Sequence, residues 1–246
     1  MENLLFTVFD ALPRLGPGDN ASTRKAFYSL PAFPQHATIL DIGCGTGVQT
    51  LELARLAPCQ ILALDNHEPY LRDLRKRARE ENLDKKISAI AGDMNNLPFS
   101  EAEFDLIWSE GGIYIIGFER GLQEWRKFLK PGGYLAVSEL IWTSNDPPDE
   151  ALKFWENEYP SMQSDRACKE VISKSGFRLI RDFMLPEDAW REYYEPLSRR
   201  VSDLKEKFAE NRTMMDLLKY VEKEISVYRE FKNHFGYVFY IMKWQG

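Results

Sequence analysis

The chain has 246 residues, of which 44% are apolar, and a formal net charge of −6 at pH 7. This length and apolar content can bury one sizeable core, and usual domain sizes favour a single α/β domain. The acidic charge argues against binding to nucleic-acid phosphates, and no apolar run approaches the roughly 20 residues of a membrane span. We therefore expect neither a nucleic-acid partner nor a membrane partner.

The expected location is the cytoplasm. Residues 1–15 lack the basic start and continuous apolar stretch of a signal peptide. The three cysteines are odd in number and widely spaced, which fits reduced thiols better than a disulfide framework. The three histidines show no metal-ligand spacing, so no metal is expected. The sequence leaves the oligomeric state open.

Short apolar strands alternate with amphipathic helices through the first 141 residues. The pattern predicts strands over 37–42, 60–65, 87–91, 104–109 and 134–141, and helices over 46–56, 69–82 and 118–129. Lys130-Pro131-Gly132-Gly133 is expected to stop the last of these helices. Such alternation is typical of a parallel, doubly wound sheet.

The remaining residues predict helices over 149–158 and 164–175, a strand over 177–184, a polar helical stretch over 187–232 and a final strand over 236–242. We expect an α/β fold with a Rossmann-like, doubly wound, seven-stranded and mostly parallel sheet, whose last strand is antiparallel. The helical stretch is inserted before that strand as a cover. Substrate choice is expected there, because open α/β sheets bind ligands beyond the carboxyl ends of their strands.

The strongest motif is Asp41-Ile42-Gly43-Cys44-Gly45-Thr46-Gly47, between the first predicted strand and its helix. Glycines let the backbone approach a ligand closely, and the start of the helix offers free N–H groups. Asp65 ends the second strand about 20 residues later, where a carboxylate can accept hydrogen bonds from both ribose hydroxyls.

Two details favour one cofactor class over another. A dinucleotide fingerprint needs glycine or alanine three positions after Gly45, where this chain has Val48, so NAD(P) is disfavoured. Asp41, just before the glycines, suits a ligand with a cationic amino-acid end, because its carboxylate compensates positive charge.

These motifs, together with Gly92-Asp93-Met94 and Leu129 to Gly133, resemble class I S-adenosylmethionine-dependent methyltransferases. The resemblance implies that Gly43, Gly45 and Gly47 line the methionine portion of S-adenosylmethionine. It also implies that Asp65 binds the ribose and that Asp93 and Met94 lie on either side of the adenine. Asn66 is expected beside the adenine edge, and Ser109, at the end of the fourth strand, is a further expected cofactor-binding residue.

Across nearly its whole length the chain is similar to a bacterial and archaeal subgroup of small-molecule methyltransferases (methyltransferase type 11/25-like). A looser similarity extends to quinone-biosynthesis and sterol C-methyltransferases. The resemblance implies one methyltransferase domain over 1–246, with a cofactor-covering segment over 1–36, a cofactor-binding core over 37–142 and a helical cover over 187–232. The segment Gly16 to Asp19 with Thr23 is expected to close over the cofactor.

Methyl transfer is an in-line displacement, so holding the acceptor near the methyl group is the main requirement. Glu110 and Tyr114 follow the fourth strand, the place that faces the methyl group in this family, and are the candidate catalytic residues. Glu110 can orient or deprotonate an acceptor. The alternative is that both residues merely line the pocket.

Aromatic residues are frequent from residue 142 to 194, and their faces can bind a cationic or planar substrate. The candidates for the substrate pocket are Glu139, Trp142, Trp190, Tyr193 and Tyr194. Ordinary core packing is the alternative for this cluster.

The leading hypothesis is methyl transfer from S-adenosylmethionine to a small-molecule substrate. One alternative is a non-catalytic regulatory protein that binds S-adenosylmethionine, and a less favoured one is an NAD(P)-dependent oxidoreductase. The sequence does not name the acceptor molecule or the acceptor atom, because positioning can replace an obligatory base.

Overall fold

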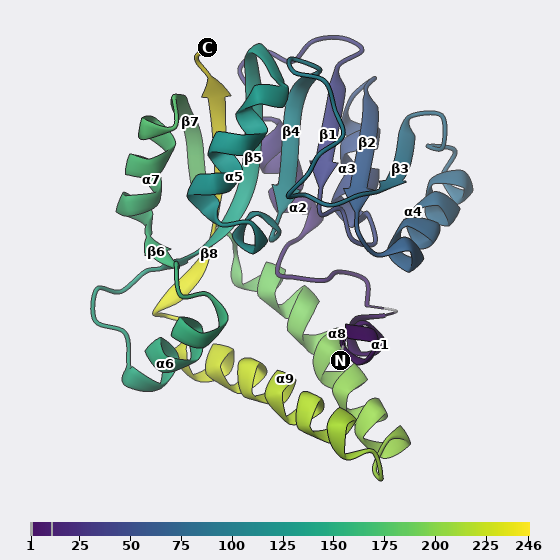
Figure 1. The fold of residues 1–246 in the computed structure, drawn as a ribbon, viewed down its shortest axis with the longest axis vertical. Coiled ribbons are helices and arrows are strands. Elements are labelled where there is room, and N and C mark those ends of the chain that lie inside the picture. The colour runs from purple at the N-terminus through teal and green to yellow at the C-terminus, as the bar shows by residue number, and fades with distance from the viewer. Residues whose placement is uncertain (1, 11) are drawn as a thin grey trace.

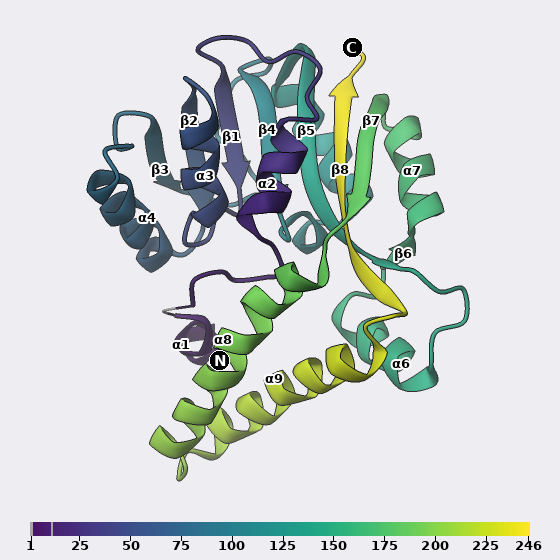
Figure 2. The same cartoon turned by 180° about the vertical axis from the view of Figure 1, so that it is seen from behind.

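The computed structural model describes residues 2–10 and 12–246. A central twisted sheet has helices on both faces, and a separate group of helices covers one end of it (Figures 1 and 2). Helices α2 (Asn20–Phe27), α3 (Val48–Leu56) and α4 (Glu68–Glu80) share one hydrophobic core with one face. Helices α5 (Phe118–Trp125) and α7 (Asp165–Lys174) share a second core with the other face.

The sheet has the strand order β3-β2-β1-β4-β5-β8-β7. Its strands are β1 (Thr38–Ile42), β2 (Gln60–Asp65), β3 (Ile87–Ala91), β4 (Phe104–Glu110), β5 (Leu129–Trp142), β7 (Phe177–Met184) and β8 (Phe235–Trp244). The first five run parallel, and β8 is antiparallel to both β5 and β7. The predicted Rossmann-like fold is confirmed, with one addition, the two-residue strand β6 (Gln163–Ser164) beside β5.

The chain order reverses between β1 and β4, because β2 and β3 build outwards on one side and β5 on the other. Such a switch point leaves a crevice at the carboxyl ends of the strands, where ligands bind in α/β proteins. The glycine-rich loop after β1 and Glu110 at the end of β4 therefore meet at this crevice.

No helix was predicted over residues 92–103, and the structure has none there. Two local predictions were wrong. Lys130 to Gly133 lie inside β5, and the preceding helix already ends in the 3-10 turn Arg126–Phe128. The glycine-rich loop extends further than expected, so α3 begins at Val48 and not at Thr46.

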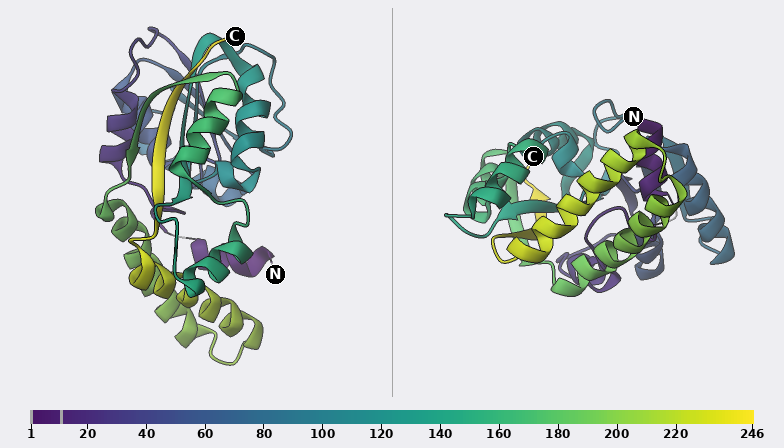
Figure 3. Two further views of the ribbon diagram at one scale, coloured as in Figure 1. Left: turned by 90° about the vertical axis from the view of Figure 1, so that its left-hand side faces the viewer. Right: turned by 90° about the horizontal axis from the view of Figure 1, so that it is seen from below.

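Two long helices, α8 (Glu187–Lys207) and α9 (Arg212–Phe231), connect β7 to β8. They pack on each other, and α1 (Glu2–Phe9) and α6 (Asp149–Glu158) pack against them. Figure 3 shows this group as a layer beyond the end of the sheet to which the parallel strands point. We call α8 and α9 the cover helices. Among the described residues, no helix combines the length and apolar character needed to cross a bilayer.

Gly47 begins α3 in the left-handed region, with φ of 76°. A Cβ atom there would lie 2.3 Å from Cδ1 of Leu74 in α4, so neither the backbone nor the packing admits a side chain.

We expect Gly47→Ala to lower the free energy of unfolding by roughly 2–4 kcal/mol, because left-handed strain and overpacking add. Urea denaturation followed by circular dichroism measures this loss. Gly16→Ala is the matched control, because a Cβ at Gly16 meets no atom within 4 Å. Equal stabilities of the two variants would contradict the account.

Candidate functional site

A cavity opens at the carboxyl ends of β1, β2, β3 and β4, which we call the first cavity. Its volume is about 240 Å³. It is lined by four segments: Arg14 to Pro17, the loop after β1 with the start of α3 (Gly43 to Thr46, Val48 and Gln49), Leu64 to Asn66 with Gly92 to Asn95, and Glu110 to Gly112 with Tyr114 and Ile115. The crevice expected from the strand order is therefore a real cavity.

The loop after β1 forms the floor of the first cavity. Gly43 and Gly45 both line it with positive φ, and a Cβ at Gly45 would lie 2.8 Å from Cδ1 of Leu15. The backbone N–H groups of Gly43 and Cys44 both donate to the carbonyl of Leu64. Gly47, predicted as a third contact of the cofactor, does not line the cavity, because it faces α4 instead.

Asp65 lies at the end of β2, and each of its two carboxylate oxygens accepts one backbone hydrogen bond. Its Oδ2 accepts from the N–H of Gly45 at 2.9 Å, and its Oδ1 accepts from the N–H of His67 at 2.9 Å. Two backbone bonds hold the carboxylate at the cavity wall. Since an ionised carboxylate has about four acceptor positions, further hydroxyl donors can bind to it.

Three more predicted residues line the same side of the cavity: Asn66, Asp93 and Met94. Asp93 Oδ1 accepts from the backbone and side-chain N–H groups of Asn95, both at 2.9 Å. The bond from the Asn95 backbone contributes most to lowering the pKa of Asp93. Asp93 is thus an ionised acceptor at neutral pH.

Two predicted cofactor residues lie behind the cavity wall instead of on it. Asp41 is fully buried and accepts a 2.5 Å bond from the hydroxyl of Thr50, and burial raises its pKa to about 7. The hydroxyl of Ser109 is also buried and donates to the carbonyl of Ile42 at 2.9 Å. Both residues brace the strand ends, and neither lines the first cavity.

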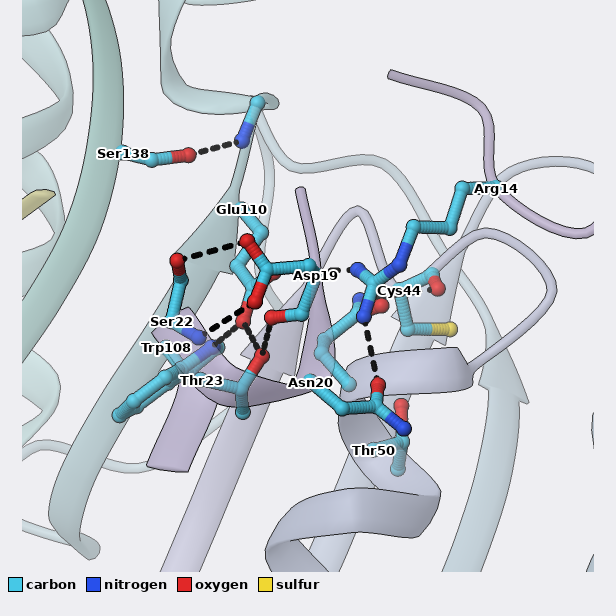
Figure 4. Close-up of polar contacts among 12 residues, drawn as sticks. Arg14, Asp19, Asn20, Ser22, Thr23, Cys44, Thr50, Trp108, Glu110 and Ser138 are labelled. Carbon is cyan, nitrogen blue, oxygen red and sulfur yellow. Dashed lines mark hydrogen bonds and ion pairs between the residues drawn. The ribbon is translucent and has the colours of Figure 1, made fainter. Parts of the chain in front are cut away.

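Glu110 lies at the centre of a buried polar cluster (Figure 4). Its Oε1 accepts from the hydroxyl of Thr23 at 2.7 Å and from the indole N–H of Trp108 at 3.0 Å. Its Oε2 forms an ion pair with Nη1 of Arg14 at 3.3 Å, and both side chains are nearly inaccessible. The carboxylate therefore ties the N-terminal segment to the end of β4.

The N-terminal segment is anchored at further points. The other guanidinium nitrogen of Arg14, Nη2, donates to Oδ1 of Asn20 at 2.7 Å, and the N–H of Gly18 donates to the carbonyl of Ala189 in α8. The hydroxyl of Thr46 donates to the carbonyl of Pro13 at 2.9 Å. These bonds place residues 14–17 between the glycine-rich loop and the cover helices.

A second cavity of about 270 Å³ lies next to the first, under the cover helices. The two cavities have Leu15, Gly16, Pro17, Gly111 and Tyr114 in common, which we call the shared wall. Most other lining residues are aromatic or apolar: Leu5, Phe6, Phe9, Tyr70, Leu140, Phe154, Trp155, Tyr159, Trp190, Tyr193, Tyr194 and Tyr237, with Glu158 and Glu224.

The predicted catalytic pair lies on or beside the shared wall. Tyr114 lines both cavities, whereas Glu110 lines only the first. Desolvation, together with nearby Glu224 and Glu158, raises the pKa of Tyr114, so its phenol is neutral at pH 7. Tyr114 can therefore donate or accept a hydrogen bond there but is not a strong base.

Of the residues predicted for the substrate pocket, Trp190, Tyr193 and Tyr194 line the second cavity. Glu139 lies behind it, where its Oε1 accepts a 2.5 Å bond from the hydroxyl of Tyr159, and burial raises the pKa of Glu139 to about 8. Trp142 lies outside the cavity, with its ring edge-on to Phe235 at 6.3 Å.

Sequence reasoning missed Arg14 and Glu224. Arg14 lies two residues before Gly16, where the segment expected to close over the cofactor begins, so its position was a usable signal. The sequence contains no comparable signal for Glu224, because α9 carries several acidic residues. Only the packing of α9 in the fold shows that Glu224 lines the second cavity. Among the described residues, no group of three or more His, Cys, Asp or Glu could hold a metal ion.

Sequence comparison finds relatives over the sheet and its loops. Residues 39–133 match a family model described as a methyltransferase domain. Sterol 24-C-methyltransferase from Kluyveromyces lactis is 31% identical over 169 residues, which cover 65% of this chain and 46% of that protein. The chain thus spans less than half the length of this relative.

Solved structures share the whole fold. An S-adenosylmethionine-dependent methyltransferase from Geobacter sulfurreducens, in complex with S-adenosyl-L-homocysteine, superposes with a TM-score of 0.86 and 16% identity over 98% of both chains. The [4+2]-cyclase SpnF superposes with a TM-score of 0.75 and 19% identity, over 99% of this chain and 92% of its own. The predicted cofactor class agrees with the first of these complexes. Residues 39–133 therefore match the methyltransferase domain model, and the chain shares the fold of these solved structures.

Proposed function

We propose that this protein transfers a methyl group from S-adenosylmethionine to a small molecule, with the cofactor in the first cavity and the acceptor in the second. The observation that carries the proposal is the shared wall, because two cavities that adjoin at Gly111 and Tyr114 can bring two ligands into contact. S-adenosylmethionine, when bound, supplies an electrophilic methyl group on a sulfonium sulfur.

The residues of the first cavity fit this cofactor. Asp65 keeps acceptor positions for two ribose hydroxyls, and the second oxygen of Asp93 can accept from the exocyclic amine of an adenine. Because Gly43 and Gly45 have no side chains, the amino-acid portion of the cofactor can lie close to the backbone of this loop. Arg14, a buried cation with five N–H donors, can bind the carboxylate of an amino-acid end.

The chain's main contribution to the reaction is positioning. Alignment of the acceptor with the methyl group can contribute roughly 7–11 kcal/mol to such a displacement. The cover helices and the N-terminal segment border the second cavity mainly with aromatic and apolar side chains, which reduces the access of water to the acceptor. Tyr114 provides one neutral polar group at the place where the ligands meet.

Glu110 acts in this scheme as a positioning residue and not as a base. Its carboxylate already binds Arg14, Thr23 and Trp108, so it holds Arg14 and the shared wall in place. Through Arg14 it also determines how the cofactor's amino-acid end is bound.

The wider organisation follows from this assignment. Residues 1–36 serve as the segment that covers the cofactor, 37–142 as the cofactor-binding core and 187–232 as the cover that selects the acceptor. The three cysteines are buried and none forms a disulfide, which supports a reducing compartment such as the cytoplasm.

Asp65→Asn tests the cofactor site. We expect its affinity for S-adenosylhomocysteine to fall roughly 10- to 100-fold, because bonds to an ionised acceptor are lost. Isothermal titration calorimetry measures the change. The matched control is Asp84→Asn, in an exposed turn after α4, which should bind normally. Unchanged affinity in a folded Asp65→Asn protein would contradict the proposed site.

Glu110→Gln tests the positioning role. We expect KM for the cofactor to rise about tenfold with a smaller change in kcat, because the ion pair to Arg14 is lost while the reacting groups remain. Hydrogen exchange should also become faster in residues 12–22. A loss confined to kcat, with normal exchange in this segment, would instead indicate that Glu110 acts as a base.

Methyl transfer itself is tested with cofactor labelled in its methyl group and fractionated cell extract. We expect a labelled small molecule, identified by mass spectrometry, whose formation is abolished by boiling the protein. Normal cofactor affinity without transfer to any fraction would favour the alternative of a binding protein without catalysis.

A further inference from the structure

The second cavity combines aromatic walls with carboxylates. Among the described residues that line it, Glu158 and Glu224 are the charged ones, and none is Lys, Arg or His. Glu224 is half-buried and Glu158 is exposed. A carboxylate partly withdrawn from water favours a cationic partner, and the described lining of this cavity supplies none.

Glu224 lies on α9, accepts a hydrogen bond and forms no ion pair with any residue that the structure describes. Its Oε1 accepts from the hydroxyl of Tyr194 at 3.0 Å. Its neighbours on the helix are paired elsewhere, because Glu222 binds Lys205 and Lys223 binds Glu150. The cationic side chain next to Glu224 in sequence is thus engaged away from the cavity.

Rings surround this carboxylate from several elements. Trp190 and Tyr194 of α8 lie nearly parallel, with centroids 6.0 Å apart, and Tyr193 packs on Tyr194 at 4.9 Å. Tyr114 and Tyr159 meet edge to face at 5.6 Å on another side. The faces of such rings attract cations, and most strongly where water is excluded.

We propose that the second cavity binds an acceptor that carries a protonated amine on an apolar body, with Glu224 as its counter-ion. This inference rests on the proposed function, which assigns this cavity to the acceptor. The ring faces contact the ammonium group and the apolar body, and Glu158 disfavours an acidic group at the same place. Glu224 holds the ammonium group whichever atom of the acceptor takes the methyl group.

Three ligands that share a phenylethyl group test this inference: 2-phenylethylamine, its neutral analogue 2-phenylethanol and the acid 3-phenylpropanoate. Each is titrated calorimetrically at pH 8 into the protein saturated with S-adenosylhomocysteine, so that no turnover occurs. We expect the amine to bind at least tenfold more tightly than the alcohol, and the acid to bind most weakly.

Two variants of α9 locate the effect. Glu224→Gln should reduce the preference for the amine over the alcohol to less than threefold, because the counter-ion is neutralised while the shape is kept. Glu230→Gln, an exposed position on the same helix, should keep the full preference. The comparison of the three ligands on the unmodified protein tests the inference even if a variant fails to fold.

The possible failures are distinguishable. Equal or tighter binding of the alcohol or the acid overturns the amine assignment, as does binding of none of the three while S-adenosylhomocysteine binds normally. Failure of S-adenosylhomocysteine itself to bind overturns the proposed function instead.

The affinity for the amine should also depend on pH. Burial, with a further contribution from Glu158, raises the pKa of Glu224 to about 7, while the hydrogen bond from Tyr194 opposes the shift. Tyr114, Tyr193 and Tyr237 also face Glu224, and their pKa values are raised, so they remain neutral. Glu158, whose pKa is raised by burial, also loses its proton as pH rises.

Because Glu224 gains its charge as pH rises, affinity for 2-phenylethylamine should increase about tenfold from pH 6 to pH 8. The same titration of Glu224→Gln should show a much smaller slope. An affinity that is flat or falls with pH in the unmodified protein contradicts the role of Glu224.

Discussion

The ion pair between Arg14 and Glu110 is the interaction on which the geometry of both cavities depends. Glu110 ends β4 at the switch point of the sheet, and Arg14 belongs to a segment with no strand or helix of its own at that place. By joining them, this buried pair sets residues 15–17 as a wall that belongs to both cavities. Separating the two side chains would leave both charges buried and unpaired, which is costly. The pair therefore holds the N-terminal segment in one position against β4.

Much of the fold and part of the lining of the first cavity could be predicted from the sequence. Residues 60–65 form a short apolar run of the kind typical of a buried parallel strand, and the glycines after β1 have backbone conformations that other residues avoid. Asp65 follows from the same logic, because the end of β2 must lie beside that loop. These features depend on local sequence and on the rule that neighbouring parallel strands end at the same edge of the sheet.

The acceptor side could not be predicted in the same way, because it depends on contacts between distant elements. The cover helices are polar overall, and which of their faces turns inward is decided by packing against α1, α6 and β8. Trp142 and Trp190 were predicted for the substrate pocket on the same grounds, yet only Trp190 lines the second cavity. Asp41 and Ser109 stand at the predicted strand ends, but their side chains bond within the protein at Thr50 and Ile42.

In the proposed reaction, the methyl group is transferred where the two cavities meet. A crystal structure with bound S-adenosylhomocysteine tests it most directly. The account predicts the ribose at Asp65 and the sulfur at the shared wall, next to Gly111 and Tyr114 and facing the second cavity. A sulfur directed away from that wall, or a ligand bound outside the first cavity, would contradict it.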